Sequence, residues 1–531
     1  MAESVDHKLD ASHPPNRTSQ DGTGLVFKLH RAGKAHLHAI VPILLSLTLF
    51  SWFITRGDWR FFDLEGLSTY YDALGDSLLQ GRLDVPRTAI LPEAFVREGK
   101  SYGYFGVTPA LIRIPLNFLF DSRWGQWARV SMTFACLLSL IFTYRILILQ
   151  RGEERLTHNP KEKAWIGIFL LAAGSGSTML FLASRAFVYH EAIIWGSTLS
   201  LISVFFLLKY QIDNRLSLLA LAGASAFLAF SARPTSGAGA ILAISGLAVL
   251  ITVNSAARRT SGRASHWLTR TLNTFGVVDM KAPPAHALWA ASFALLTACL
   301  YFGTNYLKFH TWDGVPLKYY AQYRQMPERM LLTGGKQFHL ANLPTGLAAY
   351  FGRIGVDWGP HFPWVFMRQR ATLYPGARID VNDWSSGIPG TMPALFGMSC
   401  IGAWILIRRT SAQVRQLRLP VLALGLGGSL IFFTVWIYER YLHDLYPFLV
   451  LTGIVGLNCV MRLRHPRLTT IALVIFFVLT LASISVNTSF ALEYQREIVW
   501  GVEDDKRAEF QRWRAVIDDS VRLNRPTPGH P

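Results

Sequence analysis

Residues 468–486 read LTTIALVIFFVLTLASISV and contain no charged side chain. A helix rises about 1.5 Å per residue, so this stretch matches the hydrocarbon layer of a bilayer, which is about 30 Å thick. Ten further apolar stretches with few or no charges recur along the chain. They lie at about 38–55, 127–149, 164–183, 189–208, 216–231, 237–253, 287–305, 391–408, 419–437 and 445–461. We therefore predict an all-α polytopic membrane protein with about eleven transmembrane helices.

Composition supports this class. Only 16% of the 531 residues are charged and 51% are hydrophobic, whereas a soluble globular chain carries about 25% charged residues. A disordered chain is excluded and a soluble enzyme is disfavoured. The net charge of +18 would suggest nucleic acid in a soluble protein. Here basic residues are expected at cytoplasmic loops instead, and we predict no nucleic-acid partner. The chain has no Walker loop, HExxH or GxSxG motif, so nucleotide-driven and soluble-type hydrolase functions lack support.

The distribution of basic residues predicts the orientation. If the N-terminus is cytoplasmic, the inner loops are 150–163, 209–215, 254–286, 409–418 and 462–467, and each of them is net basic. The chain then divides into a disordered cytoplasmic tail at 1–37, a transmembrane domain at 38–486 and a periplasmic tail at 487–531. Two long outer segments, 56–126 and 306–390, belong to the transmembrane domain. We expect the second to form short helices over an outward-facing cavity.

The first outer segment contains a predicted amphipathic helix. Leu67, Tyr70, Tyr71, Leu74, Leu78 and Leu79 would share one apolar face. Asp63-Leu64-Glu65 would open this helix. A carboxylate there could accept a proton from an acceptor hydroxyl or hold a divalent metal beside a phosphate. The alternative is that Asp63 or Glu65 only caps the helix and compensates its dipole.

Further polar residues are expected at the outer mouth of the helices. They come from three separate clusters, namely Arg185, His190 and Glu191; Arg233; and Arg440 with Tyr441. Together they predict a wet cavity whose arginines suit a phosphate. The alternative for each single arginine is snorkelling to lipid headgroups. A Gly/Tyr-rich turn at 98–109 adds Lys100 and Tyr104, although it could equally be a structural β-turn.

The order of these features resembles a known family. Five features carry this resemblance, namely Phe62-Asp63-Leu64-Glu65, the stretches Tyr70–Leu74 and Leu78–Leu83, the Tyr102–Pro109 turn, and Arg440-Tyr441 before Tyr446-Pro447. In these features the chain resembles the C-superfamily (GT-C fold) of membrane glycosyltransferases. That family includes the aminoarabinose and protein mannosyl transferases.

The resemblance implies a reaction and a location. A sugar would pass from a polyprenyl-phosphate-linked donor to a lipid or glycan acceptor of the envelope, at the outer face of the bacterial inner membrane. A first-loop carboxylate would assist an inverting displacement, with Asp63 favoured and Glu65 second. The donor phosphate would lie against Arg185, Arg233 or Arg440. Family members differ in metal use, so Mg²⁺ or Mn²⁺ stays open, as do the sugar, the acceptor and the oligomeric state.

Two other functions share many of these features. A transporter or flippase of lipid-linked saccharide would also need an arginine-rich cavity, and a non-catalytic scaffold of polysaccharide assembly would need only the membrane domain. The carboxylate distinguishes them, because neither a flippase nor a scaffold needs a base in the first outer loop.

The predicted orientation can be tested with reporter fusions. A fusion after Arg270 should report a cytoplasmic position and one after Gln337 a periplasmic position, because a cytoplasmic N-terminus places five net-basic loops, 254–286 among them, on the inner side. The reverse pattern would contradict the assignment of inner and outer loops.

Overall fold

The computed structural model describes residues 21–152, 159–259, 266–278, 280–312, 314–352, 356–498 and 501–522. Nine helical stretches in these residues are long and apolar enough to cross a membrane. They comprise α1 (Asp21–Ile54), α4 (Ala128–Arg151), α5 (Pro160–Ala173) with α6 (Thr178–Leu182), α7 (Val188–Asp213), α9 (Pro234–Arg259), α11 (Pro284–Phe309), α17 (Ala412–Gly428), α18 (Tyr446–Val460) and α19 (Pro466–Glu493). Two shorter apolar helices, α8 (Leu216–Ala232) and α16 (Pro393–Arg408), occupy the other two predicted positions. The prediction of an all-α polytopic fold is confirmed.

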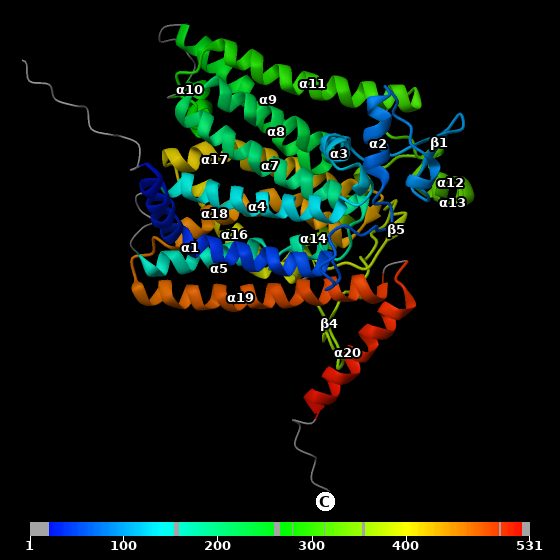
Figure 1. Ribbon diagram of the computed structural model, residues 1–531. Helices are drawn as coiled ribbons and strands as arrows, with labels where there is room; N and C mark the ends of the chain where they lie inside the picture. The colour runs from blue at the N-terminus through cyan, green and yellow to red at the C-terminus, as the bar shows by residue number, and fades with distance from the viewer. Residues whose placement is uncertain are drawn as a thin grey trace, which may run out of the picture.

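The long helices run side by side, and the two long segments, 56–126 and 306–390, gather at one end, on the right of Figure 1. We call this the loop-rich end. It contains the short helices α2 (Tyr70–Leu79), α3 (Thr108–Leu119), α12 (Ala321–Gln325), α13 (Pro327–Thr333), α14 (Leu343–Phe351) and α15 (Ile388–Thr391). The helix α10 (His266–Thr274) lies at the opposite end, and α20 (Asp504–Arg522) follows α19.

Three small sheets tie these segments together. β1 (Phe95–Arg97) pairs antiparallel with β2 (Lys100–Tyr102), with Phe95 opposite Tyr102. β3 (Asp357–Trp358) pairs antiparallel with β4 (Val365–Phe366). β5 (Val381–Asn382) pairs in parallel with β6 (Trp436–Ile437) and thereby fixes the second long segment to the chain just before α18.

Several predicted boundaries need correction. Residues 21–37, predicted as part of a disordered tail, belong to α1, while residues 1–20 lie outside the described residues. The predicted tail at 487–531 begins inside α19, continues as a π-helical turn (Tyr494–Ile498) and includes α20, with 523–531 outside the described residues.

The amphipathic helix begins later than predicted. α2 begins at Tyr70 after Thr69, so Asp63 and Glu65 lie in the preceding loop and neither opens nor caps the helix. Leu67 has a φ of 63°, a left-handed conformation that interrupts any helix running from 63 into 70. Tyr70, Tyr71 and Leu74 are fully buried, so α2 packs on the protein through its predicted apolar face, against α3.

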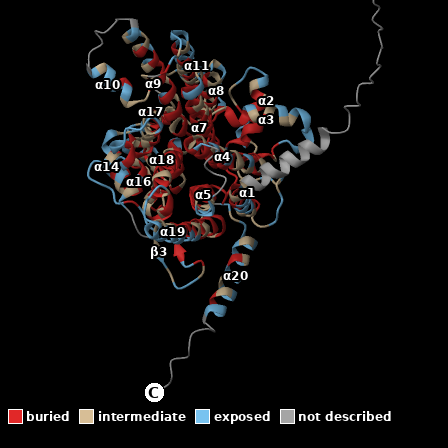
Figure 2. Ribbon diagram, turned by 90° about the vertical axis from the view of Figure 1, so that its left-hand side faces the viewer, coloured by how far each residue is buried: buried red, intermediate tan, exposed pale blue. Residues whose placement is uncertain are grey.

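Burial separates helices of similar composition. In its most apolar stretch α7 is 94% buried and lies at the centre of the bundle, whereas α19 is 22% and α11 is 17% buried. Figure 2 shows the same contrast between the central and the outer helices. α19 exposes Val474, Ile475, Phe477 and Val478. A row of large apolar side chains on an outer helix is stable against lipid rather than water, which supports an integral multi-pass membrane protein.

The closest helix contact joins α16 and α18. A Cβ placed on Gly402 would lie 1.8 Å from the carbonyl oxygen of Thr452, and one on Gly456 would lie 2.0 Å from the carbonyl oxygen of Met398. Small residues at such a contact let two membrane helices approach closely and gain van der Waals packing.

Gly402→Val should therefore destabilise the protein. Overpacking typically costs about 1–3 kcal/mol, and a backbone oxygen cannot move aside as a side chain can. Thermal unfolding in detergent measures the effect. Gly397→Val is the matched control on the same helix, because no atom lies within 4 Å of its added Cβ. Equal unfolding temperatures for the two variants would contradict the proposed contact.

Candidate functional site

A cavity of about 580 Å³ opens at the loop-rich end. Its walls come from both long segments, from α7, from the stretch before α18 and from the π-helical turn after α19. The lining residues are Pro92, Glu93, Phe95, Tyr104, Tyr189, Tyr320, Gln322, Met326, Arg329, Asp380, Val381, Asp383, Trp436, Tyr438, Arg440, Tyr441, Tyr494 and Ile498. We call it the reaction cavity. Its lining combines aromatic hydroxyls, carboxylates and guanidinium groups, which suits a polar ligand.

Arg440 is held in this cavity by aromatic rings. Its guanidinium carbon lies 3.7 Å from the ring centroid of Tyr438, 4.8 Å from that of Tyr189 and 5.6 Å from that of Tyr441. No carboxylate in the described residues lies within ion-pair distance of it. Cation–π contacts stabilise the charge without neutralising it, so Arg440 keeps its positive charge for an anionic ligand.

Three carboxylates line the same cavity, and their partners differ. Asp380 accepts hydrogen bonds from Arg329 on both oxygens (2.7 Å each), from the Tyr323 hydroxyl (2.5 Å) and from the Trp436 indole (2.9 Å). Asp383 accepts one from the backbone amide of Trp384 (2.8 Å). Asp380 is therefore saturated by the protein, whereas Asp383 has room for a ligand.

Glu93 is the third carboxylate of the cavity, and the partners that hydrogen-bond to it are uncharged. Its carboxylate accepts from the Tyr320 hydroxyl (2.7 Å) and from the Gln322 amide (3.3 Å), and it lies close enough to Tyr189 to interact with that side chain electrostatically. Tyr189 also lies beneath Arg440. A carboxylate and an unpaired cation therefore lie around one tyrosine.

Two tyrosines of the cavity, Tyr104 and Tyr320, are neutral. Burial, with the nearby charge of Glu93, raises the pKa of Tyr104 and of Tyr320 well above the usual range for tyrosine. Their hydroxyls therefore stay protonated at physiological pH. The Tyr320 hydroxyl donates its proton to Glu93, so the Tyr104 hydroxyl is the one that can donate to a bound ligand.

Arg233 lies behind the cavity wall. It pairs with both oxygens of Asp444 at 2.8–3.1 Å, and Ser236 donates to the same carboxylate. The guanidinium lies over the ring of Tyr441 at 4.9 Å. Because its charge is already neutralised by a bidentate partner, Arg233 positions Tyr441 rather than offering a free phosphate site.

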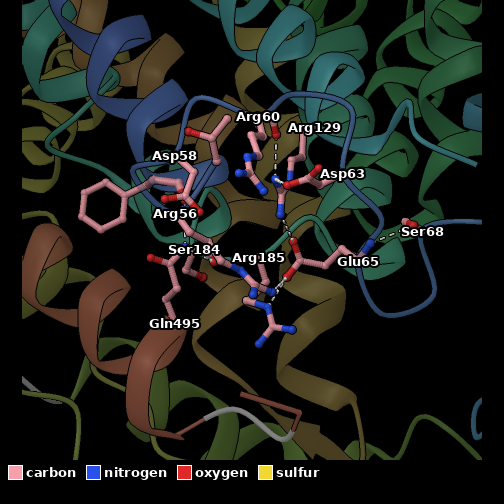
Figure 3. A network of polar contacts seen from close by, with 12 residues as sticks. Arg56, Asp58, Arg60, Asp63, Glu65, Ser68, Arg129, Ser184, Arg185 and Gln495 are labelled. Atoms are coloured by element: carbon pink, nitrogen blue, oxygen red, sulfur yellow. Dashed lines mark hydrogen bonds and ion pairs between the residues drawn. The ribbon is translucent and has the colours of Figure 1, made fainter. Parts of the chain in front are cut away.

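Arg185 belongs to a second network, which Figure 3 shows around Glu65. The buried Glu65 carboxylate pairs with Arg56, with Arg129 (3.3 Å) and with Arg185. Burial alone would raise the pKa of Glu65, but the positive charges of Arg185, Arg56 and Arg129 outweigh it and hold that pKa below its usual value of 4.5. Glu65 is therefore a fixed anion.

Asp63 lies at the edge of this network. It pairs with Arg129 at 3.2 Å, and its side chain is 43% exposed. Neither Asp63 nor Glu65 lines the reaction cavity.

The remaining predicted residues lie elsewhere. Glu191 is buried with Arg113 (2.6 Å) and Ser131 (2.5 Å), which joins α7 to α3 and α4. His190 is buried, and its Nδ1 contacts the carbonyl oxygens of Leu182 and Arg185. Lys100 is exposed on β2. Of the ten predicted site residues, the structure brings Tyr104, Arg440 and Tyr441 into the reaction cavity.

Glu93, Asp383, Tyr320 and Tyr494 were missed by sequence reasoning. Glu93 and Asp383 lie in segments with no periodicity or motif that would single them out. The described residues contain no group of three or more His, Cys, Asp or Glu side chains that could hold a metal ion.

The fold and the site define a multi-pass membrane protein with a polar, tyrosine-lined cavity at one end of its helices. No protein-family model and no curated protein matches the chain. Among solved structures it is similar to ArnT from Cupriavidus metallidurans bound to undecaprenyl phosphate, with 12% identity and a TM-score of 0.47 over 94% of this chain and 70% of that chain.

It is also similar to the oligosaccharyltransferase AglB from Archaeoglobus fulgidus in complex with an inhibitory peptide and a dolichol-phosphate. Identity is 11% and the TM-score 0.44, over 91% of this chain and 60% of that one. A structure of the Archaeoglobus fulgidus oligosaccharyltransferase in complex with Zn and sulfate is similar as well. The sequence identity is 11% and the TM-score 0.42, over 88% of this chain and 56% of that chain. The chain thus spans less than two thirds of the length of either oligosaccharyltransferase chain. These are GT-C proteins, the fold that the sequence resembles. At this distance they assign neither a family nor a reaction, so the function is argued from this chain's own residues.

Glu65→Gln should lower stability at neutral pH, because it leaves buried arginines without their anion. Removing one partner of a buried pair typically costs about 3–5 kcal/mol. The lowered pKa means that the stabilisation by Glu65 is present above pH 4.5 and is lost as the pH falls through the folded-state pKa. Thermal unfolding in detergent should therefore separate wild type from variant at pH 7 and bring them together in acid.

Asp63→Asn is the matched control, because its carboxylate is largely exposed and exposed ion pairs contribute about 0–1 kcal/mol. A gap between wild type and Glu65→Gln that stays constant down to the acid limit would show that Glu65 is not the stabilising anion.

Proposed function

We propose that the protein is a membrane glycosyltransferase. It transfers a sugar from a polyprenyl-phosphate-linked donor to a lipid or glycan acceptor at the outer face of the bacterial inner membrane, with the N-terminus cytoplasmic and the C-terminus periplasmic. The observation that carries this proposal is Arg440, a cation held by tyrosine rings in a polar cavity without a carboxylate partner in the described residues.

The phosphate of the donor binds Arg440. Guanidinium groups match phosphate oxygens through paired hydrogen bonds. In the reaction, the bond between the sugar's anomeric carbon and the phosphate oxygen breaks, and negative charge develops on the departing phosphate. A fixed cation in an enclosed site stabilises that charge more in the transition state than in the ground state.

Glu93 is the proposed base. The acceptor oxygen forms the new bond to the anomeric carbon on the side opposite the phosphate, and its proton passes to the Glu93 carboxylate. Glu93, Tyr189 and Arg440 line the same cavity, and Arg440 lies over the Tyr189 ring, so an acceptor hydroxyl and a donor phosphate can meet in this part of the cavity. Gln322 and Tyr320 orient the carboxylate through their hydrogen bonds to it.

Asp63, and after it Glu65, stays the competing assignment from the sequence. A general base must lie within hydrogen-bond reach of the proton that it removes. Glu65 is engaged by three arginines and Asp63 by one, outside the cavity lining, which is why Glu93 is favoured.

The test measures donor binding and sugar transfer with purified protein and a panel of polyprenyl-phosphate sugars. Arg440→Gln should weaken donor binding by about tenfold or more, since a hydrogen bond to a charged group contributes about 1.5–3 kcal/mol. Glu93→Gln should retain donor binding while turnover falls about 10²–10⁴-fold. Asp383→Asn and Asp63→Asn serve as carboxylate controls in the same assay.

Each outcome has a distinct meaning. Full turnover in Glu93→Gln with a loss in Asp63→Asn or Glu65→Gln would return the base to the first-loop carboxylates. Donor binding without transfer in wild type, together with movement of the lipid across a bilayer, would favour a flippase. Wild-type donor affinity in Arg440→Gln would contradict the phosphate site.

A further inference from the structure

A second cavity, of about 830 Å³, lies beside the reaction cavity at the loop-rich end. Its lining comes from the end of α11 and from the described residues within 311–312 and 314–338. The lining residues are Tyr301, Phe302, Thr311, Trp312, Gly314, Val315, Pro316, Lys318, Met330, Gly334, Gly335, Lys336, Gln337 and Phe338. α13 separates the two cavities, because Arg329 faces the reaction cavity and Met330 faces the second one.

Two cations line the second cavity. Lys318 and Lys336 contribute ammonium groups, and neither pairs with a carboxylate in the described part of the chain. The Arg378 guanidinium lies beside Gly334 at the rim. A ligand that only accepts hydrogen bonds and carries negative charge complements this set.

Gln337 adds an independent observation. Its side-chain nitrogen is buried and has no hydrogen-bond partner among the described atoms. The backbone around it is fixed, since the Val435 amide donates to the Gln337 carbonyl oxygen (3.0 Å) and the His339 amide donates to that of Phe433 (2.7 Å). A buried unpaired donor is costly, and a bound acceptor group would remove that cost.

The apolar surroundings indicate a lipid. Near the cavity, α11 exposes Leu307, and the following segment exposes Trp312, Leu331 and Leu340. Trp312 stacks on Tyr306 at a centroid distance of 4.6 Å. Aromatic rings beside large exposed aliphatic side chains are typical of the membrane–water interface, where acyl chains lie on one side and headgroups on the other.

We propose that the second cavity binds the phosphate headgroup of an anionic membrane lipid, with Lys318, Lys336 and Gln337 as its donors and the exposed face of α11 against its acyl chains. The proposal concerns binding and stands without the sugar transfer. If the transfer also holds, the site presents a lipid acceptor across α13 from the donor phosphate at Arg440.

The first test uses dioctanoyl phosphatidylglycerol, dioctanoyl phosphatidylcholine and inorganic phosphate, with binding to the purified full chain followed by native mass spectrometry. Wild type should bind phosphatidylglycerol. Its affinity for phosphatidylcholine and for inorganic phosphate should be lower by about tenfold or more. Lys318→Gln/Lys336→Gln should weaken phosphatidylglycerol binding by about tenfold or more, the usual effect of losing a charge-assisted hydrogen bond. Lys318→Arg/Lys336→Arg should keep it, and Arg87→Gln, an exposed cation outside both cavities, should not change it.

Arg440→Gln separates this site from the reaction cavity. It should leave phosphatidylglycerol binding unchanged while it weakens binding of the polyprenyl-phosphate donor. Loss of phosphatidylglycerol binding in Arg440→Gln, or equal binding in wild type and the lysine double variant, would overturn the proposal. Equal binding of inorganic phosphate would show an anion site without lipid and would overturn it as well.

A crosslinking arm does not depend on the folding of the double variant. A benzophenone side chain in place of Phe338, at the cavity, should crosslink phosphatidylglycerol in preference to phosphatidylcholine. The same group in place of Leu288, an exposed residue near the other end of α11, should show no preference. Absence of a preference at Phe338 would contradict the proposal.

Discussion

The buried Glu65 carboxylate is the interaction on which the loop-rich end depends. Its three arginines come from the end of α1, from α4 and from the connection between α6 and α7. One anion thereby fixes three segments at a single point. Backbone carbonyls at or near two of these arginines also hold the π-helical turn (Tyr494–Ile498) in place. The Arg56 carbonyl accepts a hydrogen bond from Arg496, and the Gln495 amide donates to the carbonyl oxygens of Phe53 and Ser184. The π-helical turn that carries Tyr494 into the reaction cavity is held through these contacts.

Arg440 differs from the fully buried arginines of the described residues. The buried ones are Arg113, Arg129, Arg151, Arg185 and Arg496, and each is paired with a carboxylate. This is expected, since an unpaired charge in a low-dielectric interior is costly. Arg440 keeps its charge without a carboxylate because the faces of three tyrosines stabilise it and the cavity gives it access to solvent. Such a cation is stable in the empty site yet gains most when an anion binds, which is the property that a phosphate site requires.

Hydropathy predicted the fold because crossing a membrane is a local requirement that each stretch meets by itself. Hydropathy could not predict which helices lie at the centre of the bundle, since α7 and α19 are both apolar although one is central and the other faces outward.

The site depends on pairings between residues that are far apart in the sequence. Arg233 and Asp444 are 211 positions apart, and Glu93 and Tyr320 are 227 apart. Arg440 and Tyr441 could be predicted because they lie in a polar cluster at a helix end. Glu93 could not be predicted, because only the folded segment around Tyr320 and Gln322 brings it into the cavity. Asp63 was predicted as a site residue because it was expected to begin a helix, but the backbone at Leu67 prevents that helix from forming.

The wall between the two cavities explains how the two proposed anion sites could lie close together. Arg329 faces the reaction cavity, but both of its paired nitrogens are bound by Asp380, which is also held by Tyr323 and Trp436. The wall is therefore rigid and close to electrically neutral. Arg440 on one side and the lysines on the other then act on separate ligands, because a neutral wall adds no third charge that would draw either phosphate toward the middle. The same pair fixes α13 to the strand β5, so the distance between the two sites is set by the fold and not by the ligands. For a transfer between two lipids, that geometry holds each headgroup by its own cation and leaves the reacting atoms to meet in the tyrosine-lined space beside Glu93.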